Sequence, residues 1–99
     1  MELSNKELLL DISVNLARVS DWILSEKKQK LVDRFLEGTE QFLKSLQHAH
    51  VSIRFKPTLE RFSKEFEKLL KDRNQKDREE WAERALTWAN ILQHRAKLA

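Results

Sequence analysis

The sequence predicts an all-α protein, an antiparallel up-down-up-down four-helix bundle with an extended linker between the second and third helices. One Gly and one Pro in 99 residues leave little turn chemistry for hairpins, barrels or glycine-rich phosphate loops. Apolar residues recur at alternating spacings of three and four, the period of a helix with one apolar face. Because no such helix can bury that face alone, we expect a single helical-bundle domain over residues 1–99.

The first helix is expected over residues 5–24. Ser4, followed by Glu7 three residues later, forms a capping-box pattern, in which the two side chains satisfy free backbone amides. A polar cluster ends the apolar stripe, because continuing it would bury Glu26 and Lys30. The stripe expected to face the core comprises Leu9, Ile12, Leu16, Val19 and Ile23.

The second helix is expected over residues 26–47, and Gly38 lies inside it. The apolar stripe keeps its phase across Gly38, which favours one helix; a break with Thr39 as a new N-cap is the alternative. Residues 48–57 alternate apolar and polar side chains before a Pro, which predicts an extended linker. The linker side chains expected to lie on the bundle are Val51, Ile53 and Phe55.

The third helix is expected to begin at Pro57 or Thr58, either as a Pro in the first turn or as a Thr cap. It is expected to end near Asn74, which is placed to cap the fourth helix with Asp77 three residues later. The fourth helix is expected over residues 75–97, with small residues that let a neighbouring helix approach. Its apolar face comprises Trp81, Ala82, Ala85, Trp88, Ala89, Leu92 and Ala96.

Composition narrows the function classes. The chain has 19 Lys and Arg against 16 Asp and Glu, a net charge of +3, and residues 51–99 hold the basic excess. The absence of Cys excludes disulfides, thiolate zinc sites and Cys nucleophiles. The first residues are too polar for a signal peptide, and no apolar run reaches the ~18 residues of a membrane span. These features favour a cytoplasmic protein.

A second apolar stripe makes the first helix apolar over more than half of its circumference. Leu3, Leu10, Val14 and Ala17 lie well away from the core stripe on a helical wheel, and Trp22 falls on the polar arc. In one interpretation this helix is enclosed by two neighbours, and Trp22 folds over the following turn. In the other, these five residues contact a partner protein or a second copy of the chain.

Basic side chains form a line along the third helix. Arg61, Lys64, Lys68 and Lys71 are spaced three, four and three apart, as a stripe that follows phosphates would be. Acidic residues flank the line, and Glu–Lys spacings of four are also typical of an ordinary solvated helix. The solvated-surface interpretation is favoured, and anion binding is the alternative.

No pattern indicates catalysis or a metal site. No nucleophile has a positioned base, and Ser13 and Ser20 are expected to bond back to the carbonyl one turn earlier or to permit close contact between helices. His48, His50 and His94 are expected at the surface. The chain has no Cys, no HExxH or Glu-x-x-His pair and no carboxylate in an apolar stripe that would complete a metal site with them. We therefore expect no cofactor and no metal.

By elimination, the sequence favours a non-catalytic interaction or regulatory module. It is expected to bind another protein or a second copy of itself, self-associating as a homodimer through the first or the fourth helix. The alternative is a protein that binds nucleic acid or another polyanion through the basic stripe of the third helix. No membrane partner is expected.

Overall fold

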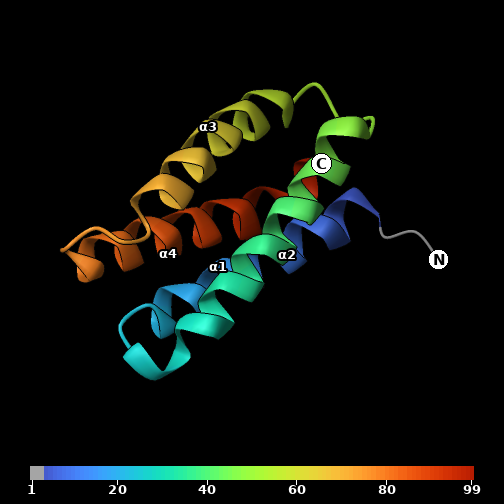
Figure 1. The fold of residues 1–99 in the computed structure, drawn as a ribbon. Helices are drawn as coiled ribbons and strands as arrows, with labels where there is room; N and C mark the ends of the chain where they lie inside the picture. Colours follow the sequence, from blue (N-terminus) through green and yellow to red (C-terminus); the bar gives the residue numbers. More distant parts are fainter. Residues whose placement is uncertain (1–3) are drawn as a thin grey trace.

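The computed structural model describes residues 4–99, and these residues form four α helices without a β-strand (Figure 1). The all-α class and the antiparallel four-helix bundle are thereby confirmed. Short 3₁₀ turns precede the second helix at Glu26–Lys28 and follow the fourth at Ala96–Leu98. The helices are α1 (Asn5–Trp22), α2 (Gln29–His48), α3 (Lys56–Asp72) and α4 (Arg78–Arg95).

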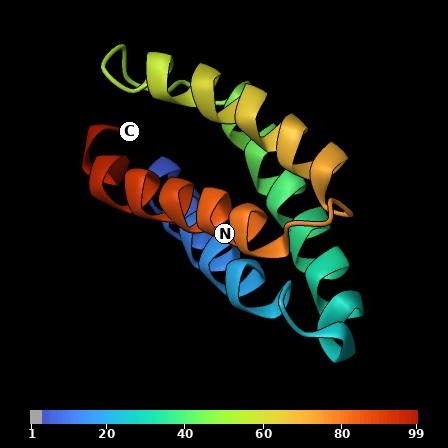
Figure 2. The ribbon, with the colours of Figure 1, turned by 90° about the vertical axis from the view of Figure 1, so that its left-hand side faces the viewer.

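Helix α1 packs against both α2 and α4 (Figure 2). The α1–α4 contact is close because small residues meet there. The buried hydroxyl of Ser13 donates to the Ala89 carbonyl at 2.7 Å, and that of Ser20 donates to the Ala82 carbonyl at 2.8 Å. Of the two expectations for these serines, bonding back within α1 is wrong and close contact between helices is what the structure has, because the alanines bring the backbone of α4 within reach of both hydroxyls.

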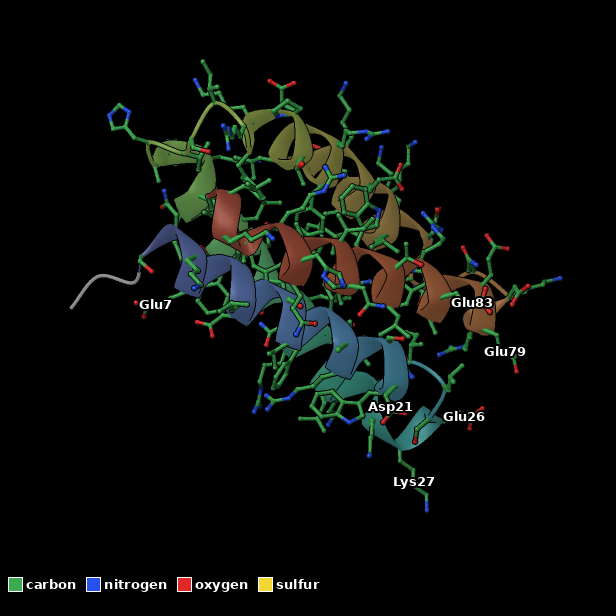
Figure 3. All side chains as sticks on the ribbon, turned by 180° about the vertical axis from the view of Figure 1, so that it is seen from behind. Glu7, Asp21, Glu26, Lys27, Glu79 and Glu83 are labelled. Carbon is green, nitrogen blue, oxygen red and sulfur yellow. The ribbon has the colours of Figure 1, made fainter. Side chains whose placement is uncertain are left out.

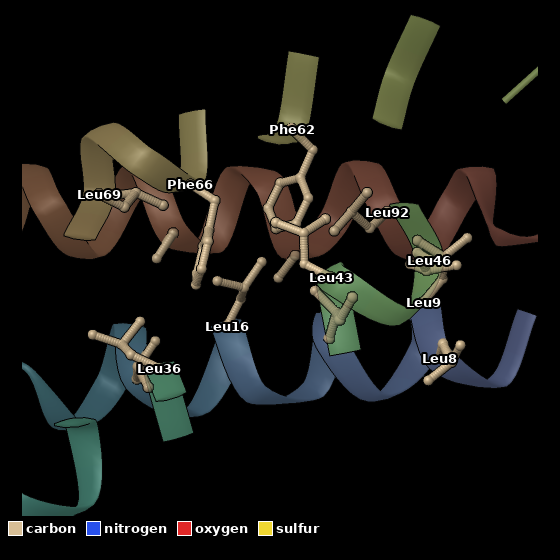
Figure 4. Close-up of a cluster of buried hydrophobic side chains, with 14 of the residues drawn as sticks. Leu8, Leu9, Leu16, Leu36, Leu43, Leu46, Phe62, Phe66, Leu69 and Leu92 are labelled. Atoms are coloured by element: carbon tan, nitrogen blue, oxygen red, sulfur yellow. The ribbon is translucent and has the colours of Figure 1, made fainter. Parts of the chain in front are cut away.

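Large side chains fill the space under α3. Phe62 and Phe66 extend from α3 toward α1 and α4, where they meet Leu16 and Leu92 in the core (Figure 4). Trp81 of α4 is completely buried, and its indole N–H donates to the Leu69 carbonyl in the last turn of α3 at 2.9 Å. Helix α3 is therefore held through aromatic rings and one buried hydrogen bond, whereas α1 and α4 meet almost backbone to backbone.

Several helix ends differ from the prediction, among them the start of α2 at Gln29, where a 3₁₀ turn occupies the first three expected residues. Ser4 caps α1 as expected, accepting a hydrogen bond from the Glu7 amide at 3.1 Å. Helix α4, however, is capped by Asp77, whose carboxylate accepts from the Glu80 amide at 2.9 Å. Asn74 is not the cap, because the chain turns between α3 and α4 and becomes helical three residues later than expected. Helix α1 also ends two residues early.

The linker between α2 and α3 is shorter than predicted and only partly extended. The Phe55 amide donates to the Ser52 carbonyl at 3.0 Å, closing a turn that leads directly into α3. This turn breaks the alternation: Val51 and Phe55 contact the core, but Ile53 is 81% exposed. The expectation that Ile53 lies on the bundle is therefore wrong.

Gly38 lies within an unbroken α2, so the alternative of a break at Thr39 is excluded. Its φ is not positive, and a Cβ at this position meets only the side-chain amide nitrogen of Asn15 at 3.9 Å, an ordinary contact. Because Gly costs ~1 kcal/mol relative to Ala inside a helix, Gly38→Ala is expected to stabilise the protein by up to about 1 kcal/mol. Thermal unfolding followed by circular dichroism should show a Tm higher by several degrees; an unchanged or lower Tm contradicts this.

Candidate partner-binding face and basic groove

Helices α1 and α4 border a hollow of about 450 Å³ on the outer surface of the bundle. Its sides are formed by the end of α1 and the beginning of α4, and several of its lining residues have short side chains. We call this surface the acidic face. Its lining residues are Ala17, Ser20, Asp21, Leu24, Glu79, Ala82, Glu83 and Leu86.

Exposed leucines lie on both sides of this hollow. Leu24 at the end of α1 is 53% exposed, and Leu86 on α4 is 43% exposed. Val14, which is 46% exposed, lies one helical turn before Ala17 on the same side of α1. The acidic face therefore presents apolar side chains from two helices to the solvent.

The charges of the acidic face have one sign. Asp21, Glu79 and Glu83 line the hollow with no Lys or Arg among them, and Figure 3 shows the three at the end of the bundle where α1 ends and α4 begins. Among residues 4–99, none of these carboxylates forms an ion pair. Arg78 donates to the Ile23 carbonyl at the same end of the bundle but does not line the hollow. Three carboxylates beside exposed apolar side chains favour a cationic surface as the partner.

The structure does not bring the five residues predicted as a partner contact together on one surface. Val14 and Ala17 are exposed on the side of α1 that leads to the acidic face, whereas Leu10 is half-buried against the core. Trp22 packs edge-on against Phe35 of α2, with ring centres 4.9 Å apart. It thus has a partner within the chain, away from the acidic face. Leu3 lies outside the described residues.

Sequence reasoning missed Leu24 and Leu86. Leu24 continues the second stripe of α1, since 14, 17, 21 and 24 are spaced three, four and three apart. The predicted first helix included Leu24, but this residue was not counted in the second stripe, because the polar Asp21 lies between it and Ala17. Leu86 could not be identified from the sequence, because its position beside the hollow depends on which side of α4 packs against α1.

The basic stripe of α3 is exposed as expected, and the structure brings part of it into a second hollow. Arg61, Lys64, Lys68 and Lys71 all reach the solvent. The first three line a hollow of about 310 Å³ between α3 and α4. We call this hollow the basic groove; the other residues that line it are Thr58, Glu65, Trp88, Ile91 and Arg95.

The three histidines do not form a metal site in the described part of the chain. His48, His50 and His94 are exposed, and residues 4–99 contain no cluster of three His, Asp or Glu side chains able to hold a metal ion. In the same part of the chain, no helix has the length and apolar character needed to cross a membrane.

Comparisons with protein families, with curated proteins and with solved structures found no match to this chain.

Proposed function

We propose that this protein is a non-catalytic interaction module whose acidic face binds a basic amphipathic helix of a partner protein. The observation that carries the proposal is the combination of the exposed Leu24 and Leu86 with Asp21, Glu79 and Glu83 around one hollow. An amphipathic helix that lies in an apolar groove is a common mode of recognition between proteins.

The shape of the hollow suits an apolar anchor. Ala17 and Ala82 line the hollow with short side chains, and Leu24 and Leu86 also line it. A Leu or Phe side chain of the partner that enters this space removes apolar surface from water on both molecules. Complete burial of one such side chain contributes about 1.5–3 kcal/mol.

The charge of the face favours a cationic partner over a second copy of the chain. In a two-fold symmetric dimer the same patch meets itself, so three carboxylates of one copy would approach three of the other. Like charges in an interface are unfavourable, whereas Lys and Arg residues that flank the anchors of a partner would pair with them. The homodimer expected from sequence is therefore the weaker proposal.

A double substitution at the leucines tests the apolar part. The probe is a fluorescein-labelled synthetic helix of Leu and Lys with one apolar face, and its binding is followed by fluorescence anisotropy. Leu24→Ser with Leu86→Ser is expected to weaken binding at least tenfold, since ~1.4 kcal/mol changes an affinity tenfold. The control is Leu31→Ser on α2, which removes a similarly exposed leucine elsewhere and should leave the Kd within twofold. Equal loss in both proteins contradicts the proposal.

Neutralising the carboxylates tests the electrostatic part. Glu79→Gln with Glu83→Gln is expected to weaken binding of the same peptide and to reduce its dependence on salt, because fewer charges then attract it. Glu37→Gln with Glu67→Gln makes the same change in net charge at exposed sites of α2 and α3 and should have little effect. Sedimentation equilibrium adds a further check: a dimer that Leu24→Ser with Leu86→Ser dissociates would overturn the proposal in favour of a second copy.

A further inference from the structure

The basic groove combines positive charge with an aromatic wall. Arg61, Lys64 and Lys68 enter it from α3 and Arg95 from the end of α4, so four cations surround one hollow that contains a single carboxylate, Glu65. Trp88 and Ile91 of α4 supply the apolar side. Its volume of about 310 Å³ is near the lower limit of typical ligand sites, which is enough for one small ring system.

The cations are available to an anion to different degrees. Within the described part of the chain, Arg61 and Lys64 form no ion pair, whereas Lys68 lies 3.4 Å from the Glu65 carboxylate. Arg95 donates to the hydroxyl of buried Thr58 at 2.7 Å, which holds its guanidinium at the groove. Four cations around one hollow repel one another, and an anion placed among them relieves that repulsion.

The aromatic wall is supported from behind. Trp88 is half-buried, and its ring lies 5.5 Å from that of Phe62, which is itself completely buried in the core. This support restricts the motion of the indole. A supported, partly exposed indole beside several cations is the combination with which proteins bind a planar base and its phosphate.

Carboxylates limit where the phosphate can lie. Glu80 and Glu83 line a neighbouring hollow against Trp88, and Glu65 borders both hollows. Arg84 also lines this second hollow, but it is paired with Asp72 at 3.1 Å. With three carboxylates and one paired cation, the side of Trp88 that faces the second hollow is unfavourable for an anion. The favourable position lies toward Arg61, Lys64 and Arg95.

We propose that the basic groove binds a nucleotide unit, with the base against Trp88 and the phosphate among Arg61, Lys64 and Arg95. Such a unit occurs in a free nucleotide and in single-stranded nucleic acid, and both present the same chemistry. A duplex does not fit, because its bases are stacked on one another and cannot lie on the indole. The groove uses residues separate from Leu24, Leu86 and Glu79, so this site is independent of the proposed function.

The binding experiment uses a fluorescein-labelled oligonucleotide of twelve thymidines, with anisotropy measured at two salt concentrations. We expect salt-dependent binding, weaker binding of a duplex of the same length, and competition by unlabelled single strand. Displacement of the probe by ATP at low concentration identifies a free nucleotide as the ligand, and its absence identifies single-stranded nucleic acid; both support the proposal. Equal displacement by inorganic phosphate, or tighter binding of the duplex, overturns it.

Charge variants locate the site. Arg61→Gln with Lys64→Gln is expected to weaken binding at least tenfold. Lys30→Gln with Arg34→Gln removes the same charge from exposed positions of α2 and should leave the Kd within twofold. Equal losses would mean that only net charge attracts the oligonucleotide, and the proposal would be wrong.

Two further variants separate a specific site from a structural effect. Glu65→Gln removes the carboxylate from the groove and releases Lys68, so binding is expected to tighten several-fold, a gain that damage to the fold does not produce. Trp88→Leu is expected to weaken binding several-fold, and Trp88→Phe should recover part of it, with circular dichroism confirming that both variants fold. An unchanged Kd in Trp88→Leu, or in Glu65→Gln, overturns the proposal.

Discussion

Replacing Trp81 with Ala is expected to lower the free energy of unfolding by about 3–5 kcal/mol, the range for removing a fully buried aromatic side chain. Trp81 is 0% exposed and joins α3 to α4, both by filling the space between them and by donating to the Leu69 carbonyl. Because small domains are stable by only ~5–15 kcal/mol, this loss removes a large part of the stability of the protein and should lower the denaturant midpoint strongly. Urea denaturation followed by circular dichroism measures the change.

Trp81→Phe is the matched control for this prediction. It keeps an aromatic ring but removes the indole N–H, so the Leu69 carbonyl loses that partner. We expect a smaller loss than in Trp81→Ala. A Trp81→Ala protein within 1 kcal/mol of the wild type would contradict the role of Trp81 as the main link between α3 and α4.

The second large effect is expected at the α1–α4 contact. Ala85 is completely buried on α4, between the two alanines whose carbonyls accept hydrogen bonds from Ser13 and Ser20. Ala85→Leu adds three carbon atoms where the helix backbones are close together, and it should separate the helices and strain both hydrogen bonds. Overpacking of this kind costs about 1–3 kcal/mol and occasionally more.

Thr87→Leu provides the comparison for Ala85→Leu. It introduces the same side chain two residues later on α4, at an exposed position, and surface changes usually stay within about 0.5 kcal/mol. Denaturant midpoints of the two variants should therefore differ clearly. Equal stability of the two variants would mean that the α1–α4 contact tolerates a larger residue.

The helices could be predicted from sequence because each carries its own signal. The stripe from Leu9 to Ile23, the continuous phase across Gly38 and the Ser4 cap are local patterns, and all three appear in the structure. The small residues of the fourth helix also indicated a close neighbour, although the pattern does not say which helix that is.

What could not be predicted depends on residues far apart in the chain. The hydroxyl of Ser13 bonds to a carbonyl 76 residues away, which no local spacing reveals. Arg95 joins Arg61 and Lys64 only because the end of α4 lies beside the start of α3. Turn geometry was missed for another reason: Asn74 and Asp77 are both good caps, and local sequence does not decide between them.

The contact between α1 and α4 has a consequence for folding during synthesis. During synthesis α1 emerges first of the four helices, yet its hydrogen bonds to α4 join residues 62 and 76 positions apart. At ~5–20 residues per second, the ribosome leaves Leu9, Ile12 and Leu16 without their final neighbours for several seconds. Helix α2 can cover one side of α1 early, but the side of α1 that faces α4 stays exposed until the last helix is complete. Because this contact joins distant parts of the chain, we expect slower folding than in a bundle built only from sequential hairpins.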